Sequence, residues 1–446
     1  MSPPIDKVQS DEKLPTFVDV VVIGGGIAGI TAALELARRG TSVAILEKGY
    51  IAGEQSGRNW GWCRQQNRAE GELPLMKLSL QLWEGYQQDF GIDLGFRRTG
   101  LVYGTDNPSD LDAWERWSKM ASGYGVTSRV LTAAETSALL PGNARRWLGG
   151  VHSPSDAFAE PDRAVPAMAL MAQRLGATIH QRCAVRELEF SAGRVSGVIT
   201  EHGLLKCSSV LVAAGAWSNM LLRHHGFKFL QASVQSTTFC TTPVQGVSEG
   251  GVSMQDIALR KRVDGGLTVG ISGYGRLHLS PRGVQQVKPF WPMFQRRRAG
   301  LTYSLGRYFF EGPDAIRRWS ADGVSPFEVV RVLDPEPEAR LIARGLKGLT
   351  DAYPHLKGTV SVAHSWAGMV DQTPDSIQVI SPVQSTPGLF ISSGYSGHGF
   401  GTGPGAGHLA ADLIRGDTPC TNPSPFRYER MIDGTDLSKA AKASLI

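Results

Sequence analysis

The sequence lacks paired cysteines and long apolar runs. Its five cysteines form no CxxC pair, and such a sparse, odd set is typical of reduced thiols rather than of a disulfide framework or a zinc site. No run of about 18 apolar residues occurs, so no transmembrane helix is expected. The start of the chain is polar and lacks the apolar stretch of a secretory signal. We therefore expect a cytoplasmic protein without a transmembrane segment or a bound metal.

The sequence also lacks a strong excess of one charge. Its 46 lysines and arginines stand against 41 aspartates and glutamates, a net charge of +5 over 446 residues. That mild balance gives no reason to expect nucleic-acid binding. Hydrophobic residues make up 41% and charged residues 20%, as in ordinary folded proteins, and the length suits two or three domains. Glycine is abundant, so the placement of the glycines becomes the next question.

The chain opens with the pattern of a β-α-β unit. Residues 18–23 form an almost continuous β-branched apolar run, which predicts a parallel strand buried on both faces. Residues 30–39 have the apolar face of a helix, and Gly40 stands where a helix would end. Residues 42–46 then predict a second strand.

A glycine motif lies between the first strand and the helix, in the form Gly24-x-Gly26-x-x-Gly29. Gly24 permits a tight turn, Gly26 lets the backbone approach a pyrophosphate, and Gly29 allows close packing of helix on strand. The helix N-terminus presents free N–H groups to phosphates. Glu47 follows the second strand, where it can accept hydrogen bonds from a ribose. The alternative is a glycine-rich turn without a ligand, but the strands, the helix and the acidic residue all agree with dinucleotide binding.

The rest of the chain predicts helices and strands in mixed order. The helices are expected over residues 72–90, 109–124, 133–139, 161–175, 335–353 and 408–415, and the strands over 177–185, 186–200 and 204–212. No internal repeat is visible. The residues after Thr418 are expected to form an irregular, weakly packed tail.

Four further segments decide which dinucleotide is bound. Residues 53–62 are small and polar, residues 210–218 form a hydrophobic strand that ends in a glycine turn, residues 371–380 begin with Asp-Gln-Thr-Pro-Asp, and residues 388–405 are rich in glycine. In this order and spacing the chain resembles the D-amino-acid oxidase superfamily of FAD-dependent oxidoreductases, which includes D-amino-acid dehydrogenases, glycine oxidase, sarcosine oxidase and γ-glutamylputrescine oxidase. The resemblance is specific for the superfamily and weak for the substrate.

The resemblance implies an α/β fold with two parts. One is a Rossmann-type FAD-binding domain with a glutathione-reductase-like βαβ unit, and the other is an inserted α+β substrate domain built on an antiparallel sheet. The FAD-binding domain is expected over residues 17–90, 151–230 and 359–418, the substrate domain over 91–150 and 231–358, and a C-terminal tail over 419–446.

The resemblance also implies a set of residues that contact FAD. These are Gly24, Gly26, Ile27, Ala28, Gly29, Glu47, Lys48, Gln55, Ser56, Asn59, Gly61, Trp62, Val185, Ala214, Gly215, Trp217, Gly394, His398, Gly399, Phe400, Gly401 and Thr402. The backbone of residues 394–405 would lie against the flat isoalloxazine ring without Cβ clashes, and Pro404 would occupy the first turn of the next helix. That helix would favour the negative charge of reduced flavin. A purely structural glycine loop is the alternative.

FAD is expected to be bound non-covalently. Sarcosine-oxidase-like relatives attach their flavin through a cysteine, but Met369, Val370 and Asp371 occupy that stretch here. Other relatives use a histidine in the loop after the first β-α-β unit, and residues 50–70 contain none. Gly401 stands where sarcosine-type enzymes carry a lysine, which puts that arrangement in doubt.

The candidate catalytic residues are Arg64, Trp366, Tyr395 and His398. Arg64 follows the flavin loop, and its fork can bind a substrate carboxylate bidentately, although a structural arginine is the alternative. Trp366 and Tyr395 would form aromatic walls that orient the substrate C–H toward flavin N5. His398 is expected to orient the backbone rather than to shuttle protons. Arg296 to Arg298 most simply form a solvated basic face.

These features predict an amine or amino-acid oxidase or dehydrogenase of the EC 1.4/1.5 type. A hydride would pass from the α-carbon of the substrate to flavin N5, and water would hydrolyse the resulting imine. Oxygen or an electron carrier would reoxidise the flavin. Two alternatives stay open at this point: oxidation of a 2-hydroxy acid or polyol, with His398 as the base, and a flavin-binding subunit of a larger complex.

Overall fold

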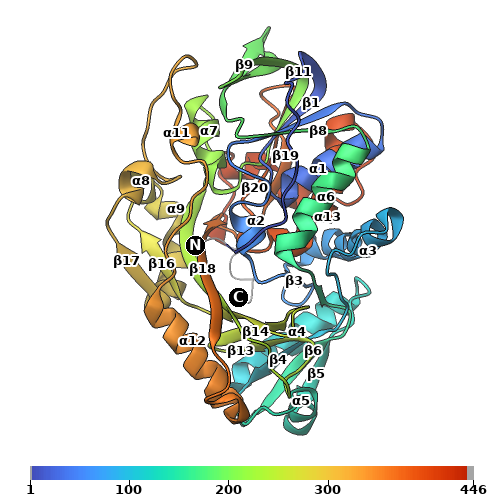
Figure 1. The fold of residues 1–446 in the computed structure, drawn as a ribbon, viewed down its shortest axis with the longest axis vertical. Helices are drawn as coiled ribbons and strands as arrows, with labels where there is room; N and C mark the ends of the chain where they lie inside the picture. Colours follow the sequence, from blue (N-terminus) through green and yellow to red (C-terminus); the bar gives the residue numbers. More distant parts are fainter. Residues whose placement is uncertain (1–2, 439–446) are drawn as a thin grey trace.

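Two large β-sheets organise the chain in the computed structural model, which describes residues 3–438 (Figure 1). The first sheet, in the upper part of Figure 1, consists of β1 (Phe17–Ile23), β2 (Val43–Glu47), β8 (Thr178–Gln181), β9 (Val185–Ser191), β10 (Arg194–Thr200), β11 (Gly203–Val212), β19 (Val379–Pro382) and β20 (Leu389–Ser393). Its strand order is β19-β20-β11-β1-β2-β8, and β10 and β9 extend it from β11.

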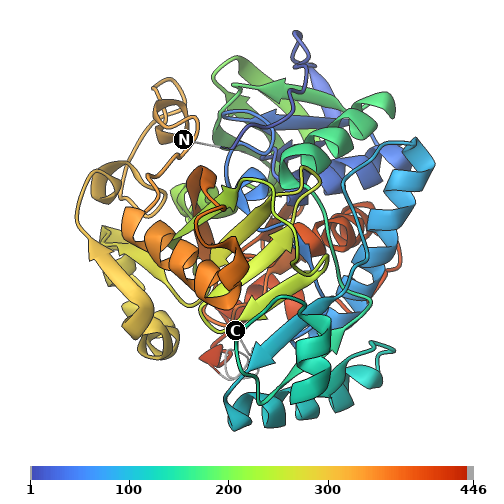
Figure 2. The same cartoon turned by 60° about the horizontal axis from the view of Figure 1, so that its bottom comes forward.

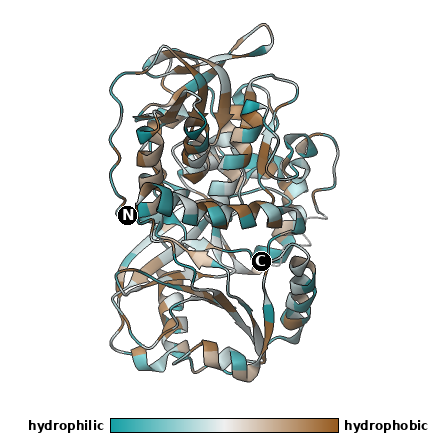
Figure 3. Ribbon diagram, turned by 90° about the vertical axis from the view of Figure 1, so that its right-hand side faces the viewer, coloured by the Kyte–Doolittle hydropathy of each residue, from teal (hydrophilic) through white to brown (hydrophobic). Residues whose placement is uncertain are grey.

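Strand β1 lies at the centre of this sheet, as its apolar run predicts. It pairs in parallel with β2 on one side and with β11 on the other. Val21 and Val22 point to opposite faces and are both fully buried. Hydrophobic residues, brown in Figure 3, accordingly fill the strands of this sheet. The parallel βαβ arrangement of a Rossmann-type domain is therefore confirmed.

The second sheet lies in the lower part of Figure 1. It consists of β4 (Leu101–Thr105), β5 (Arg129–Thr132), β6 (Gly149–Ser153), β12 (Ala232–Thr241), β13 (Gly251–Met254), β14 (Ile257–Lys261), β15 (Leu267–Ile271), β16 (Gly275–His278), β17 (Leu301–Ser304) and β18 (Val362–Gln372). The order is β17-β16-β12-β15-β14-β13-β4-β6-β5, with β18 also paired to β12. Most pairs are antiparallel; β13 with β4 and β16 with β17 are parallel.

Helices cover both sheets. They are α1 (Ile27–Arg38), α2 (Gln55–Arg58), α3 (Leu73–Phe90), α4 (Pro108–Ser122), α5 (Ala133–Leu139), α6 (Pro161–Arg174), α7 (Ser218–His224), α8 (Pro281–Gln285), α9 (Val287–Arg297), α10 (Tyr308–Glu311), α11 (Pro326–Val329), α12 (Ala339–Ala352) and α13 (Gly399–Arg415). Figure 2 shows α12 lying across the strands of the second sheet. Across residues 3–438, every helix is too short or too polar to span a bilayer.

Strand β18 differs from the expected domain division. It follows the predicted boundary between residues 358 and 359, yet it pairs with β12 along its whole length, from Val362 to Gln372. It therefore belongs to the second sheet, and the chain returns to the first sheet only at β19. The boundary at residue 150 likewise falls inside β6. Continuous ladder hydrogen bonds decide which sheet a strand joins, and here they differ from the boundaries that the resemblance implied.

The glycine-rich C-terminal segment also differs from expectation. Helix α13 begins at Gly399, so Pro404 lies inside the helix and not in its first turn. Proline cannot donate the usual N–H, and the helix tolerates it here because a neighbouring side chain completes the local bonding. The Ser79 hydroxyl of α3 accepts from Gly405 N (3.1 Å) and donates to Gly401 O (2.7 Å).

The glycines of α13 serve close helix packing. A Cβ on Gly407 would lie 2.4 Å from the carbonyl carbon of Thr31 in α1, and a Cβ on Gly405 would lie 2.6 Å from the carbonyl oxygen of Leu75 in α3. A hydrogen bond of 2.8 Å from Thr31 Oγ1 to Gly403 O accompanies this contact. Gly405 therefore serves helix packing, whereas the expected contact of the segment with the flavin ring stays a prediction.

Residues 424–431 are packed, contrary to the prediction of a loose tail, and residues 439–446 of that tail lie outside the described part of the chain. Short 3₁₀ turns at Ser424–Phe426 and Tyr428–Met431 bury Phe426, Tyr428 and Met431. Arg430 forms a buried ion pair of 2.8 Å with Asp375. The aromatic and ionic anchors are too widely spaced in sequence to predict this contact.

Replacing Gly407 by alanine is expected to destabilise the protein by about 1–3 kcal/mol, because the new methyl group collides with the backbone of α1. Thermal unfolding followed by circular dichroism measures the effect. Gly85 in α3 provides the control, since a Cβ there meets nothing within 4 Å. Gly85→Ala should raise stability by about 0.5–1 kcal/mol. Equal melting temperatures for the two variants would contradict the packing role of Gly407.

Candidate dinucleotide and substrate site

A cavity of about 1530 Å³ is lined by residues of both sheets. It runs against the ends of β1 and β2 in the first sheet and against β4, β12 and β16 in the second. Typical small-molecule sites have about 300–1,000 Å³. The volume therefore suits a dinucleotide together with a substrate.

The glycine motif at one end of the cavity has the geometry that its spacing predicts. Gly24 has a φ of +115°, and a Cβ there would lie 2.4 Å from Ala213 O. A Cβ on Gly29 would lie 2.1 Å from Gly24 O, so this glycine serves the helix–turn contact. Gly26 precedes the first turn of α1 without a side-chain cap, and Ile27 and Ala28 follow it along the cavity wall. The unobstructed helix N-terminus fits a pyrophosphate.

Glu47 is bound to the glycine loop in a way that still permits ribose binding. Its two carboxylate oxygens accept hydrogen bonds from Gly25 N and Gly49 N, both at 2.7 Å. Burial raises the pKa of Glu47, while Lys48 and the two N–H groups act in the opposite direction. Each oxygen keeps a second lone pair toward the cavity for a hydroxyl donor.

Lys48 lines the cavity but has no proton left for a cofactor. Its ammonium donates to Glu54 Oε1 (2.6 Å), Val330 O (2.8 Å) and Arg331 O (3.0 Å), which uses its three N–H groups. It also lies 4.5 Å from the centre of the Trp217 ring. The side chain of Lys48 therefore anchors residues 330–331, and its expected contact with the cofactor stays a prediction.

Most of the other predicted contact residues also face the cavity. These are Gln55, Ser56, Asn59, Trp62, Val185, Ala214, Gly215, Trp217, His398, Gly399 and Phe400. Ser56 Oγ accepts from Ile27 N at 2.9 Å, and Asn59 Oδ1 accepts from Gly61 N at 2.7 Å. Residues far apart in sequence thus meet around one space, as expected for a bound FAD.

Five of the predicted contact residues lie outside the cavity lining and so do not form its surface. They are Gly29, Gly61, Gly394, Gly401 and Thr402. A Cβ on Gly61 would lie 2.4 Å from Ala159 O, and a Cβ on Gly401 would lie 2.8 Å from the Cα of Cys63. Thr402 Oγ1 donates to His398 O at 3.1 Å. Their small size or local bonding shapes the site without direct contact.

The buried Arg68 and the half-buried Arg64 lie side by side on the cavity wall. Arg68 Nε donates to Arg64 O at 3.2 Å, and Arg64 donates to Gln66 O. Arg68 Nη1 has no hydrogen-bond partner within residues 3–438. Burial and the neighbouring Arg64 lower the pKa of Arg68 to about 10, so it still carries its charge at neutral pH. A buried guanidinium with an open donor is a suitable site for an anion.

Aromatic donors border the same region. Tyr103 Oη and Trp62 Nε1 are buried, line the cavity and find no partner in the described part of the chain. Trp62 contacts Tyr103 edge to face at 6.1 Å between ring centres. The sequence analysis missed Arg68 and Tyr103. The position of Arg68 four residues after Arg64 was a usable signal, whereas nothing in the sequence near Tyr103 indicates the site.

His398 is buried at the cavity wall as a neutral imidazole. Burial, Arg68 and Arg64 lower its pKa well below the usual value. Its Nδ1 lacks a hydrogen-bond partner among the residues that the structure describes. His398 N donates to Tyr395 O at 2.8 Å, and Tyr395 Oη lies 2.7 Å from Ser392 Oγ. Both predicted residues therefore face the cavity, and His398 has a free nitrogen there.

Trp366 lies elsewhere, contrary to its expected place at the flavin. Its Nε1 donates to Arg58 O at 2.8 Å and its ring stacks on His364, outside the cavity lining. The hydrogen bond to the backbone of Arg58 holds the indole beside α2 instead. The aromatic wall instead includes Trp60 and Trp62.

The predicted solvated basic face also lies partly at the site. Arg296 and Arg297 line the cavity, because α9 ends beside it. They add positive charge to the region of Arg64 and Arg68.

Comparisons with known proteins agree with this geometry. The family model described as FAD dependent oxidoreductase matches residues 19–413. The L-amino acid deaminase of Proteus myxofaciens, solved in complex with anthranilate, is 29% identical over 96% of this chain and 97% of that chain, with a TM-score of 0.92. The L-amino acid deaminase of Proteus vulgaris is 28% identical over 95% and 99%, with a TM-score of 0.89. Sarcosine oxidase subunit beta of Rhizobium meliloti is 27% identical over 93% of this chain and 89% of its own length.

Gly26→Val is expected to abolish FAD retention without unfolding the protein. A Cβ on Gly26 meets only Ser56 Oγ, at 3.0 Å, so a larger side chain enters the phosphate path and spares the backbone. The ratio of flavin to protein absorbance and the melting curve of the flavin-free protein measure the two effects. Gly29→Val, which strikes Gly24 O, should lower the melting temperature as well. A yellow Gly26→Val protein would overturn the assignment of this loop.

Proposed function

The chain belongs to the family of FAD-dependent oxidoreductases, and from this we propose that it oxidises the C–N bond of an amino acid whose carboxylate lies against Arg64 and Arg68. The observation that carries the proposal is the buried Arg68 guanidinium in the cavity lining, whose Nη1 has no hydrogen-bond partner in the described part of the chain. A carboxylate is the substrate group that satisfies such a donor.

The similar proteins support a substrate of this class. Their names include L-amino acid deaminase, sarcosine oxidase subunit beta and glycine oxidase. Each of these names refers to an amino acid or an N-methylated amino acid, and both groups of compounds carry a carboxylate beside the amine. The unpartnered Arg68 guanidinium and the names of the similar proteins together favour an amino acid over a simple amine as the substrate.

The residues of this chain would bind and orient the substrate. Bound FAD supplies a hydride acceptor at flavin N5. Arg64 and Arg68 would hold the carboxylate, and the tryptophans of the aromatic wall would exclude water from the amine. His398, neutral and with Nδ1 lacking a partner in the described chain, would accept a hydrogen bond from the substrate amine, which would react in its neutral form. The α-carbon would then lose hydride, and water would hydrolyse the imine to a keto acid and ammonia.

A 2-hydroxy acid, whose carboxylate would fit the same two arginines, is the second candidate substrate class. An anaerobic screen of flavin bleaching with L- and D-amino acids, amines and hydroxy acids distinguishes the two. Bleaching by amino acids supports amine oxidation, and bleaching by hydroxy acids alone contradicts it.

We also propose that O₂ or an electron carrier reoxidises the flavin, and that the protein works in the cytoplasm. All five cysteines are free thiols, which suits a reducing compartment.

Arg68→Gln and Arg64→Ala are expected to lower kcat/KM for the best amino acid by an amount equivalent to about 2–5 kcal/mol, because a buried charge pair loses one partner. Arg68→Lys should recover only part of the loss, since an ammonium lacks the bidentate fork. The amine that corresponds to the decarboxylated substrate provides the control, and its kcat/KM should change little. Unchanged kinetics on the amino acid in both variants would rule out the two arginines as the carboxylate site.

FAD is expected to be non-covalent, so acid precipitation should leave it in the supernatant. Cys63 lies near the flavin loop, but its thiol is buried, donates to Gly61 O at 3.9 Å, and has a pKa that burial raises well above the usual value. It lies outside the cavity lining and is therefore unsuited to a thioether link. The amount of flavin in the supernatant and in the redissolved pellet is measured by absorbance at the flavin maximum. Flavin that stays with the pellet would contradict the expectation.

A further inference from the structure

The segment Trp60-Gly61-Trp62, here called the tryptophan loop, carries two indoles of the cavity wall. The rings of Trp60 and Trp62 meet edge to face at 5.9 Å between centres. Trp60 Nε1 donates to Thr238 Oγ1 in the second sheet at 3.0 Å. The loop thus lies where the two sheets meet at the cavity, and its position decides the shape of that wall.

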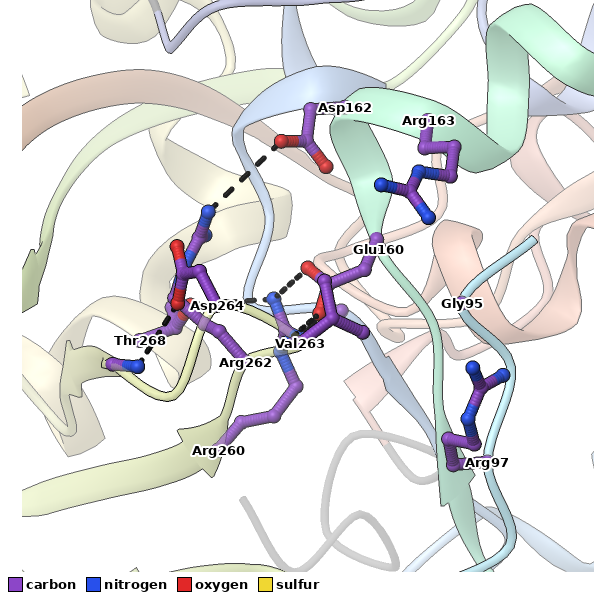
Figure 4. Close-up of polar contacts among 12 residues, drawn as sticks. Gly95, Arg97, Glu160, Asp162, Arg163, Arg260, Arg262, Val263, Asp264 and Thr268 are labelled. Carbon is purple, nitrogen blue, oxygen red and sulfur yellow. Dashed lines mark hydrogen bonds and ion pairs between the residues drawn. The ribbon is translucent and has the colours of Figure 1, made fainter. Parts of the chain in front are cut away.

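A buried ion pair contacts this loop, and Figure 4 shows its two residues, Arg260 and Glu160. Arg260 of β14 makes two parallel bonds to Glu160, Nη1 to Oε1 at 2.7 Å and Nη2 to Oε2 at 3.0 Å. Their side chains are 1% and 2% exposed. Glu160 immediately precedes α6, next to the first sheet, so the pair joins the two halves of the molecule.

Both carbonyl groups at the start of the loop are bound to this pair or to its neighbour in the chain. Arg260 Nε donates to Trp60 O at 2.7 Å. Ala159 N, next to Glu160, donates to Gly61 O at 2.8 Å. The loop also packs on the guanidinium, because a Cβ on Gly61 would lie 2.8 Å from Arg260 Nε.

The remaining bonds fix the plane of the guanidinium. Arg260 Nη2 also donates to Thr268 Oγ1 at 3.2 Å, and Glu160 Oε1 also accepts from Val263 N at 3.1 Å. Figure 4 shows Glu160, Val263 and Thr268 around the same arginine. Burying such a pair contributes little net stability compared with apolar residues of similar volume. A planar guanidinium with several fixed acceptors does, however, define the position and orientation of the groups that it binds.

We propose that Arg260 and Glu160 are positioning residues for the flavin site. The pair fixes the tryptophan loop, and through the loop it sets the affinity for FAD and the contour of the substrate cavity. The inference rests on FAD binding in this cavity and is independent of which substrate is oxidised.

The test uses flavin-free protein labelled with 5-fluorotryptophan, whose ¹⁹F signals report each indole. Trp60→Phe and Trp62→Phe assign the two signals of the loop. Arg260→Met should shift both signals and weaken FAD binding at least tenfold, measured by quenching of FAD fluorescence. Arg260→Lys should give an intermediate loss, because it keeps the charge but not the contact to Trp60 O.

Arg430→Met is the matched control. Arg430 and Asp375 form an ion pair with side chains 4% and 2% exposed, and neither residue lines the cavity. This variant should lower the melting temperature while the loop signals stay in place and FAD affinity stays within twofold. If Arg260→Met does not fold, Glu160→Gln decides by the same two measurements, since it keeps the shape of the side chain.

One result overturns the inference. A folded Arg260→Met or Glu160→Gln protein with a lowered melting temperature, unchanged loop signals and unchanged FAD affinity would show that the pair stabilises the fold and does not position the site. Failure of the amino-acid proposal would appear separately, in the substrate screen, because neither readout here involves a substrate.

Discussion

Close backbone contact at glycine positions is the constraint on which the cavity depends. Gly24 approaches Ala213, Gly29 approaches Gly24, and Gly407 approaches Thr31, each at distances that leave no room for a side chain. These contacts let α13 lie directly on α1 and bring the start of α13 to the N-terminal end of α1. Residues near positions 26 and 398 thereby come to line one cavity.

Buried charge serves two different purposes in this molecule. Arg260 and Arg430 are paired with carboxylates and have further bonds to backbone or hydroxyl oxygens. Arg68 is equally buried, yet one of its nitrogens has no partner in residues 3–438. Because an unsatisfied buried guanidinium is costly, the first arrangement indicates a role in the architecture and the second indicates a place for a ligand.

The agreement between sequence and structure is closest where the pattern is local. The apolar run at residues 18–23, the glycine spacing and the acidic Glu47 each describe a single βαβ unit, and the structure has that unit with α1 starting at Ile27 instead of residue 30. Gly29 lies in the first turn of the helix. Because glycine has a low helix propensity, the residue pattern predicts a later start for the helix. Lys48 and Trp366 illustrate the limit, because their partners at residues 330–331 and at Arg58 are distant in the chain.

The sequence by itself determined the dinucleotide motif, because that motif follows from short-range spacing and alternation, and the resemblance to a known family implied the two-part α/β fold. Only the tertiary structure decided that β18 joins the second sheet, that Arg68 and Tyr103 share the cavity with Arg64, and that Arg260 reaches across to Glu160. The physical reason is that strand pairing and buried polar contacts join residues up to several hundred positions apart. The energies of these contacts depend on which groups lie next to each other after folding. A local sequence pattern does not predict which distant groups those are.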